Sequence, residues 1–364
     1  MCRPLISTPN RRDSVASSDT RPAALVTGAA GFIGSHLVRE LLRLGRVRVV
    51  ALDDLSGGYR HNVADGAEFV EASVTDHATL ARLFDKHQFR YVYHLAAYAA
   101  EGLSHFIRRF NYTNNVIGSI NLINESVRHE VESFVFTSSI AVYGAVEPPM
   151  REDQMPRPED PYGVAKYAVE LDLAAAHEMF GLPYVVFRPH NVYGEYQNLG
   201  DPYRNVIGIF MNQVMTGRPL SVFGDGTQER AFSYVGDIVP AIAQSPWVPA
   251  ARCQIFNIGA DIPYSVNELT EHVARAMGQP GHLVKHLPAR NEVRVAFSDH
   301  SKAASVFGLG SQTPLAEGLS RMAAWARKVG IQSAKPFEGI EVTRNLPPSW
   351  TAMIAAPRSN PSMS

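Results

Sequence analysis

The chain has 364 residues, of which 45% are hydrophobic and 19% are charged, and its formal net charge is −1. This composition is ordinary for a soluble globular protein, and its near-neutrality argues against binding nucleic acid or a membrane surface through bulk charge. The two cysteines, Cys2 and Cys253, lie too far apart in sequence to form a disulfide framework or a metal site, so we expect no metal and a cytoplasmic location. No apolar run approaches the roughly 18 residues of a membrane span.

The two ends of the chain differ from its middle. Residues 1–21 are polar and contain no apolar stretch, which predicts a disordered leader. After about residue 331 the chain becomes rich in Pro and Ser, so we expect a tail over 333–364 whose last residues, S-N-P-S-M-S, are loose. Between these ends we expect a larger domain over 22–190 and a smaller lobe over 191–332, partly interleaved with it.

Apolar segments and helical patterns alternate from residue 23 onward. The expected strands are 23–27, 48–52, 68–70, 91–95, 134–137, 183–188 and, later, a piece at 254–258. The expected helices are 32–44, 77–87, 110–129, 161–180 and 265–277. Strands without strict polar alternation, separated by helices, predict an α/β protein with a parallel, doubly wound sheet of the Rossmann type, followed by a smaller α/β lobe.

A glycine-rich stretch, T-G-A-A-G-F-I-G (27–34), lies between the first expected strand and helix. Gly28 permits a tight turn, Gly31 lets the backbone approach a pyrophosphate, and Gly34 lets the helix pack closely on the strand. The following helix N-terminus offers N–H groups to an anion. A purely structural turn is the competing interpretation, but the position between a strand and a helix favours a dinucleotide site.

Asp53 ends the second expected strand, about 20 residues after the glycines, where such sites hold the ribose. A carboxylate suits the two ribose hydroxyls of NAD and repels a 2′-phosphate. The nearest downstream arginine is Arg60, seven residues on. The sequence therefore favours NAD over NADP.

Tyr162 and Lys166 are spaced i, i+4 in P-Y-G-V-A-K-Y (161–167), on one face of an expected helix. A neighbouring ammonium lowers the pKa of a phenol and prepares it for general acid–base work. Such a pair alone is commonly just a helix surface. Here it follows T-S-S-I-A-V-Y-G (137–144), whose hydroxyls lie at a strand's C-terminal end, where ligands bind in an open α/β sheet.

With these elements in order, the chain resembles the extended short-chain dehydrogenase/reductases, the nucleotide-sugar epimerase and dehydratase family. The resemblance covers roughly residues 23–330. It rests on T-G-A-A-G-F-I-G-S-H-L, D-D-L-S-G-G, H-L-A-A, N-N-V-I-G-S, S-S-I-A-V-Y-G, Y-G-V-A-K, R-P-H-N-V-Y-G and F-G-D-G-T-Q-E-R-A-F-S-Y-V. It implies retained NAD, a nucleotide-sugar substrate and a homodimer built on the helices near 110–129 and 161–180.

The resemblance also implies roles for individual residues. Those expected in catalysis are Ser139 as the hydroxyl on the reacting oxygen, Tyr162 as the base and Lys166 as its partner. Those expected to contact NAD are Gly28, Gly31, Phe32, Ile33, Gly34, Asp53, Leu95, Ala96, Ala97, Tyr162, Lys166 and Pro189. Those expected to contact the nucleotide-sugar are Ser139, Asn191, Phe223, Arg230, Arg290 (or Arg294) and Asp299. Asn115 is expected to brace the catalytic helix.

Three segments depart from the family pattern. Ala72-Ser73-Val74 replaces the usual adenine-contacting Gly-Asp pair, which puts that contact in doubt. Glu101, in Y-A-A-E-G-L-S-H (98–105), either faces the sugar or is a solvated loop carboxylate. His190 is either a wall of the pocket or a catalyst.

The residues after Ser139 favour one reaction. The family's 4,6-dehydratases carry Asp-Glu there, whereas this chain has Ile140-Ala141. Losing a general acid or base typically costs roughly 10²–10⁴-fold, which argues against elimination. The GDP-mannose 3,5-epimerases use a Cys at the site of Ala141 and a Lys beyond N-V-Y-G, and this chain has no Lys between Lys166 and Lys285.

Inversion at C4 needs none of these additional groups, so the expected function is an NAD-dependent UDP-sugar 4-epimerase. The sugar stays open among UDP-glucose/UDP-galactose, N-acetyl and uronic acid forms. A small residue, Ala296, aligns with a large one that limits the pocket at sugar C2 in some 4-epimerases, which suggests room for an N-acetyl group. Other nucleotide-sugar-modifying members of the family and, from another class, a non-catalytic NAD-binding sensor remain alternatives.

Overall fold

The structure is a computed structural model that describes residues 19–289, 293–333, 337–348, 350 and 351. Arg290 therefore lies outside the described residues, as do most of the expected leader and the final S-N-P-S-M-S. Over the described part of the chain, every helix is too short or too polar to cross a bilayer.

The main sheet is parallel throughout and, in the described residues, contains seven strands. They are β1 (Ala23–Thr27), β2 (Arg48–Asp53), β3 (Glu68–Glu71), β4 (Phe89–His94), β5 (Ser133–Thr137), β6 (Tyr184–Pro189) and β11 (Gln254–Ile258). Their order is β11-β6-β5-β4-β1-β2-β3. Successive strands are therefore added on one side of β1 up to β3 and on its other side from β4 onward, so the strand order reverses between β1 and β4. This is the doubly wound Rossmann arrangement, and the predicted fold class is confirmed. Ligands of such sheets bind at the carboxyl ends of the strands beside the reversal.

Helices cover both faces of the sheet. On one face lie α1 (Phe32–Leu44) and α8 (Val235–Gln244); on the other lie α2 (His77–His87), α5 (Gly118–Arg128) and α6 (Pro161–Phe180). Successive β1 side chains point to opposite faces, so Leu25 packs with the second group and Val26 with the first. Burial on both faces explains why these strands read as continuous apolar runs.

The pattern over 110–129 predicts one regular helix, but the structure has three different helical segments in this region. The region begins with α4 (Arg108–Tyr112), passes through a π-helical turn at Thr113–Ile117, and only then becomes α5. The wider turn contains Asn115, which is 2% exposed and hydrogen-bonds inside the protein. π-Turns of this kind frequently occur at functional sites.

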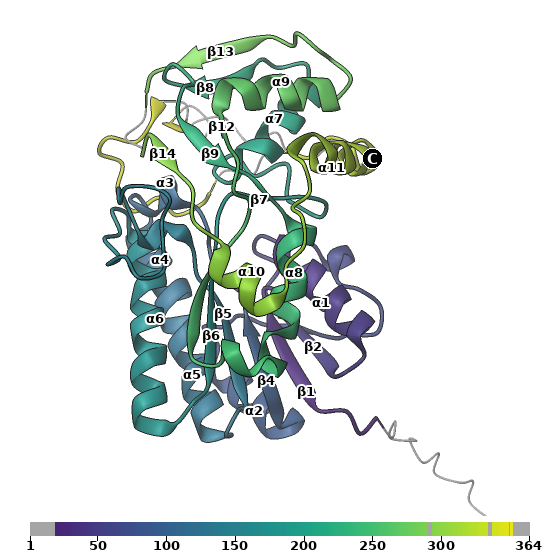
Figure 1. The fold of residues 1–364 in the computed structure, drawn as a ribbon, viewed down its shortest axis with the longest axis vertical. Coiled ribbons are helices and arrows are strands. Elements are labelled where there is room, and N and C mark those ends of the chain that lie inside the picture. The colour runs from purple at the N-terminus through teal and green to yellow at the C-terminus, as the bar shows by residue number, and fades with distance from the viewer. Residues whose placement is uncertain (1–18, 290–292, 334–336, 349, 352–364) are drawn as a thin grey trace, which may run out of the picture.

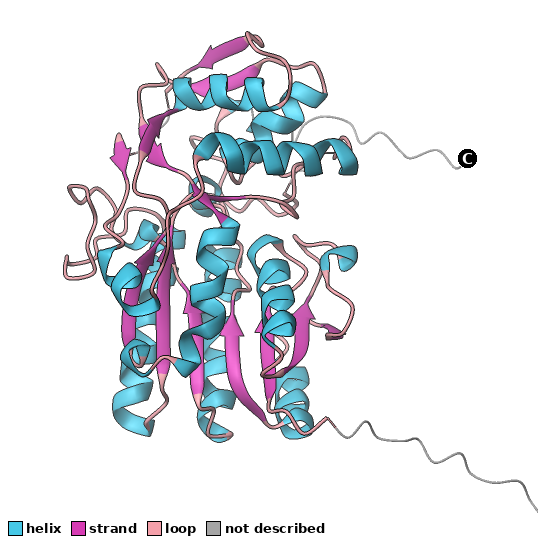
Figure 2. Ribbon diagram, turned by 45° about the vertical axis from the view of Figure 1, so that its right-hand side comes forward, coloured by secondary structure: helices cyan, strands magenta, loops and turns pink. Residues whose placement is uncertain are grey.

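The remaining elements form a smaller lobe beyond the carboxyl ends of the strands (Figures 1 and 2). Its strands are β7 (Val192–Tyr193), β8 (Leu220–Phe223), β9 (Glu229–Ala231), β10 (Ser233–Tyr234), β12 (Pro263–Ser265), β13 (Val284–Leu287) and β14 (Val295–Ala296). Its helices are α7 (Val206–Met215), α9 (Val266–Ala276) and α11 (Leu315–Val329), whereas α10 (Ser301–Phe307) packs against β6 and β11 of the main sheet. The short α3 (Glu101–Ser104) follows β4, and 3₁₀ turns occur at Arg60–Asn62, Ile140–Val142, Ser245–Trp247 and Pro249–Ala251.

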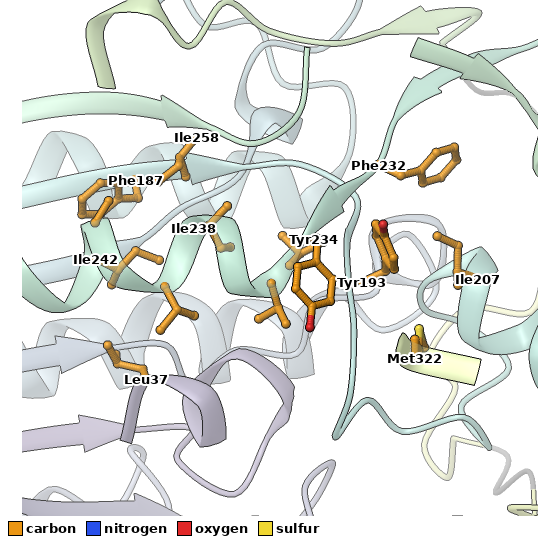
Figure 3. Close-up of a cluster of buried hydrophobic side chains, with 14 of the residues drawn as sticks. Leu37, Phe187, Tyr193, Ile207, Phe232, Tyr234, Ile238, Ile242, Ile258 and Met322 are labelled. Atoms are coloured by element: carbon orange, nitrogen blue, oxygen red, sulfur yellow. The ribbon is translucent and has the colours of Figure 1, made fainter. Parts of the chain in front are cut away.

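A single buried hydrophobic cluster joins the sheet to the lobe (Figure 3). Leu37 of α1, Phe187 of β6 and Ile242 of α8 pack with lobe residues such as Tyr193 and Met322. Since β11 and α8 come from sequence after residue 190, the chain returns from the lobe to complete the sheet and its helical layer. The lobe is therefore held at a fixed place over the strand ends.

Candidate active site

The glycine-rich turn between β1 and α1 is closed too tightly for side chains. Gly28 has φ +69°, and a Cβ there would lie 2.8 Å from the backbone nitrogen of Ala96. A Cβ on Gly34 would overlap the carbonyl oxygen of Gly28. The N-cap of α1 is Gly31, which has no side chain to cap the first N–H groups. The first N–H groups of α1 therefore have no side-chain cap, and the turn fits a dinucleotide pyrophosphate.

Asp53 ends β2 beside this turn and is 8% exposed. Its carboxylate accepts hydrogen bonds from the N–H of Ala30 (3.0 Å) and of Leu55 (2.8 Å). Burial raises the pKa of Asp53, and these hydrogen bonds oppose that rise. Asp53 therefore organises the glycine-rich turn in addition to lying where a ribose is expected. Phe32 and Ile33, at the start of α1, are half-buried and pack against the main core.

The end of β4 lies directly beside the glycine-rich turn. Thr27 Oγ1 hydrogen-bonds His94 Nδ1 (2.8 Å) and accepts from the N–H groups of Leu95 and Ala96. Burial, and secondarily the charge of Lys166, lowers the pKa of His94 to about 3, so its ring is neutral. This ladder joins the two strands at the reversal and leaves the segment Leu95–Ala97 half-buried along the cleft.

Ser139, Tyr162 and Lys166 come together at the carboxyl end of β5. Ser139 Oγ accepts from the Ala141 N–H (3.1 Å) and begins the 3₁₀ turn. Burial raises the pKa of Tyr162, a hydrogen bond from the Ser139 side chain lowers it, and the negative charge of Glu101 adds to the rise. The Ser139 side chain thus lies within hydrogen-bonding reach of the Tyr162 hydroxyl.

Lys166 lies beneath the tyrosine ring. Its side chain is buried, Nζ donates to the Thr137 carbonyl (2.8 Å), and the same atom lies 5.8 Å from the ring centroid of Tyr162. Burial lowers the pKa of Lys166 to about 7, while the carboxylate of Glu170 opposes this shift. The lysine is therefore anchored to the strand that carries Ser139.

Two residues that the sequence analysis missed set the start of the catalytic helix. Asp160 Oδ1 accepts from the N–H groups of Tyr162 (2.9 Å) and Gly163 (3.0 Å) and caps α6. A Cβ on Gly163 would come within 2.5 Å of the Ala141 carbonyl oxygen, so glycine lets α6 touch the 3₁₀ turn. The Asp-Pro pair before the helix, a capping residue followed by proline, is the signal that could have identified Asp160.

A buried charged network underlies this site. Arg188 Nε and Nη2 donate to the two carboxylate oxygens of Glu170 (3.0 and 2.5 Å), and Ser138 Oγ donates to the same carboxylate (2.5 Å). Arg188 Nη1 also donates to the Tyr143 hydroxyl (2.7 Å), which donates to Asn257 (2.9 Å). Glu170 lies four residues after Lys166 on α6, and this spacing was the available signal. The network ties α6 to β6 behind the serine-bearing strand end.

Asn115 connects the site to the π-turn. Its Oδ1 accepts from the Tyr98 N–H (2.8 Å), and its Nδ2 donates to Asn111 Oδ1 (2.8 Å). Asn111 Nδ2 in turn donates to the Pro161 carbonyl (2.8 Å) at the start of α6. The chain of contacts links the end of the β4 segment to the helix that carries Tyr162.

The residues expected to hold the nucleotide-sugar are spread over the lobe. Asn191, after β6 and the buried Pro189, has φ +41° and donates to the Ala231 carbonyl (3.2 Å). Arg230 directly precedes Ala231 in the sequence. Its guanidinium donates to the carbonyls of Val293 (2.5 Å) and Arg294 (3.2 Å). Asn191 thus bonds to the backbone of the residue that follows Arg230. The other two described residues lie elsewhere, Phe223 at the end of β8 and Asp299 just before α10.

His190 is a buried structural residue in this geometry. It is 2% exposed, its Nδ1 lies 3.0 Å from the Ala231 carbonyl, and its Nε2 lies 2.9 Å from Nε2 of His300. Burial lowers its pKa to about 3. His190 therefore joins β6, β9 and the α10 segment. Within the described ranges, no group of three His, Cys, Asp or Glu side chains is placed to hold a metal ion.

The Rossmann sheet, the glycine-rich turn with Asp53, and the Ser-Tyr-Lys arrangement define an extended short-chain dehydrogenase/reductase. The model of the NAD dependent epimerase/dehydratase family matches residues 24–259, and the chain belongs to that family. It is an enzyme of this family, and its cofactor is NAD.

Known 4-epimerases are similar to this chain in both sequence and structure. A UDP-glucose 4-epimerase of Mycolicibacterium smegmatis is 36% identical over 312 residues, which cover 83% of this chain and 98% of the relative. The structure of UDP-glucose 4-epimerase from Thermotoga maritima with UDP-glucose is 34% identical, has a TM-score of 0.80, and matches 84% of this chain and 99% of its own. A UDP-N-acetylglucosamine 4-epimerase from Methanobrevibacter ruminantium, in complex with UDP-N-acetylmuramic acid, is 29% identical, with a TM-score of 0.78 over 84% of this chain and 98% of its own.

Proposed function

We propose that the protein is a UDP-sugar 4-epimerase that interconverts sugars of the UDP-glucose/UDP-galactose type through a transient 4-keto sugar. The observation that carries this proposal is the arrangement at the end of β5. The buried Lys166 lies 5.8 Å from the ring centroid of Tyr162 and donates to the Thr137 carbonyl, and two apolar residues directly follow Ser139. The names of the relatives support the same reaction class.

The proposed catalytic groups have matching chemistry. Ser139 and Tyr162 hold the C4 hydroxyl of the sugar, and Tyr162 takes its proton as that carbon is oxidised. NAD, held by the glycine-rich turn and Asp53, would supply the hydride acceptor for C4 and the hydride donor for the opposite face of the 4-keto sugar. Tyr162 then gives the proton back to the C4 oxygen. A positive charge on Lys166 favours the tyrosinate, and its bond to the Thr137 carbonyl fixes its position.

The turn after Ser139 supports reversible oxidation rather than elimination. Ile140 and Ala141 occupy the two positions where the resembling dehydratases place an acid and a base. Ala141 is 8% exposed, and its carbonyl faces Gly163 at the start of α6. A carboxylate side chain at Ala141 would have to be buried against this helix. Oxidation and reduction at C4 do not require such a carboxylate.

The proposed substrate contacts come from the lobe. Asn191, Arg230 and Arg290 are assigned to the diphosphate, because a planar guanidinium binds phosphate oxygens in two places. Phe223 is assigned to the nucleotide base and Asp299 to its ribose. Ala296 is buried beside Val142 and Tyr143, next to the turn that follows Ser139. A small side chain there supports a secondary proposal, that an N-acetyl group at sugar C2 is admitted.

One experiment tests the reaction and the sugar together. The protein is incubated in heavy water with UDP-glucose, UDP-glucuronate and UDP-N-acetylglucosamine, and the products are followed by NMR. We expect the C4 epimer without deuterium in the sugar, because the hydrogen on C4 is removed and returned without exchange with solvent. Deuterium at C3 or C5, or a 4-keto-6-deoxy product, would contradict the proposal. No turnover of any substrate would favour a non-catalytic NAD-binding protein, and inactivity on UDP-N-acetylglucosamine alone would remove the N-acetyl proposal.

We further propose that the protein is a homodimer joined through α6. Val164, Leu171 and Met179 are 39%, 55% and 75% exposed, and their spacing of seven and eight residues puts them on one face of the helix. Covering such a stripe against a second copy would remove it from water. Light scattering is expected to give the mass of two chains, and the mass of one chain would contradict this proposal.

A further inference from the structure

The last described residues of the chain pack against the rest of the protein. Residues 337–348, 350 and 351, here called the C-terminal strap, lie against α3 and α4 (Figure 1, yellow). The N–H groups of Glu341 and Val342 donate to the Phe106 carbonyl (2.8 and 3.2 Å). The Glu341 carboxylate accepts from the N–H groups of Arg109 (2.7 Å) and Phe110 (2.8 Å). The strap thus caps the first turn of α4 with a negative charge, which stabilises that end of a helix.

Aromatic side chains anchor the strap more firmly. Trp350 is 4% exposed and packs in a hydrophobic cluster with Ala100, Leu103 and Ile107. Its ring centroid lies 5.1 Å from that of Tyr203. Phe337 lies between two rings of the opposite segment, 5.1 Å from Tyr98 and 4.9 Å from Phe110. Burial of large aromatic side chains supplies most of the energy of such contacts.

Beneath the strap, the 98–112 segment touches the start of the catalytic helix. Ser104 Oγ lies 3.2 Å from the backbone nitrogen of Tyr162, which donates to it, and Oγ lies 3.4 Å from the Asp160 carboxylate. Asn111 reaches the Pro161 carbonyl from the same segment. The position of Tyr162 therefore depends on a segment that the strap holds.

The strap also holds a loop on the cofactor side, residues 198–204. The Phe337 N–H donates to the Tyr203 hydroxyl (3.2 Å). Arg204 pairs with Asp201, lies 5.0 Å from the ring centroid of Tyr98, and approaches Gly57, where a Cβ would lie 3.1 Å from its Nη2. Gly57 belongs to the loop that follows Asp53. The loop thus spans from the expected ribose side of the cleft to the segment after β4.

We propose that the C-terminal strap is a positioning element of the active site, which fastens the 98–112 segment and the 198–204 loop together across the cleft and so keeps NAD bound through turnover. This inference rests on the proposed function only for the reason that NAD must be retained. The 4-keto sugar and the reduced cofactor must stay together until the sugar is reduced. Glu341, Phe337 and Trp350 act through these two segments rather than on the reacting atoms. Closure of such segments commonly controls ligand release.

The test measures NAD dissociation from the full-length protein, with no substrate present. Trp350→Ala is expected to speed the loss of bound NAD by about tenfold or more, because differences in ligand retention appear mainly in the off-rate. Glu341→Gln keeps the shape but removes the charge, and should speed it by about two- to fivefold. Arg344→Ala alters an exposed side chain of the same strap and serves as the matched control.

A second measurement separates positioning from general stability. With UDP-glucose, Trp350→Ala should release keto sugar, trapped by borohydride reduction, more often per turnover than Arg344→Ala. Unchanged NAD off-rates in both Trp350→Ala and Glu341→Gln would overturn the proposal, as would an equal rise in Arg344→Ala. The NAD off-rate is measured without any sugar. A failure of the proposed epimerase activity would therefore not affect this test of the strap.

Discussion

Replacing Tyr162 by phenylalanine is expected to lower the epimerase activity by roughly 10²–10⁴-fold, the usual effect of removing a general acid or base. The variant should still contain NAD, because the glycine-rich turn and Asp53 are untouched. Tyr162 is 7% exposed and its hydroxyl is adjacent to the Ser139 side chain, so the change removes one oxygen without opening a cavity. Turnover at saturating UDP-sugar and the cofactor content of the purified variant provide the measurement.

Tyr167→Phe is the matched control for this prediction. Tyr167 lies on the same helix, is half-buried and packs with Tyr143 and Met150 rather than with Ser139. It should keep nearly full activity. If Tyr162→Phe retained activity close to that of Tyr167→Phe, Tyr162 could not be the proton acceptor. Loss of NAD in Tyr162→Phe would instead indicate a role in holding the cofactor.

Replacing Arg188 by methionine is expected to lower the free energy of unfolding by roughly 3–5 kcal/mol, the usual consequence of leaving one partner of a buried ion pair alone. Arg188 and Glu170 are 2% and 4% exposed, and two hydrogen bonds join them. Without the guanidinium, the carboxylate keeps only the Ser138 hydroxyl among the contacts described above. Urea unfolding gives the stability directly.

The double variant Arg188→Met/Glu170→Leu tests the cause. It removes both charges and should be more stable than Arg188→Met, because the penalty comes from the stranded carboxylate rather than from losing a favourable pair. Lys86→Met, which removes one partner of a half-exposed pair with Glu68, is the control and should change stability by about 1 kcal/mol or less. A double variant less stable than Arg188→Met would refute this account.

Local patterns predict much of the fold correctly. The first strand, the helices 32–44, 77–87 and 161–180, and the glycine-rich turn lie where the pattern predicts them. Each depends on neighbours a few residues apart, such as the glycine after α1 with φ +67° or the proline at the start of α6. The π-turn before α5 escapes the same reasoning, because a single widened turn barely changes the hydrophobic period.

Only part of the arrangement of the candidate site can be predicted from local sequence patterns. The spacing of Tyr162 and Lys166 on one helix face follows from helix geometry, and Ser139 follows from its place at a strand end. Asp160, Ser104 and the Glu170–Arg188 pair were not anticipated. Ser104 lies 58 residues from Tyr162 in sequence, and nothing in its neighbourhood indicates that the two meet.

The sequence alone determines the class of this protein, because the strand–turn–helix with its glycines, Asp53 and the Ser-Tyr-Lys set are short patterns whose chemistry follows from residue type and spacing. Only the tertiary structure decided what surrounds them. Glu341 meets Phe110 across 231 residues of chain, and nothing in the composition of the tail indicates this contact. Such contacts depend on which apolar faces are left to be covered once the sheet and lobe have assembled, and local periodicity carries no information about that.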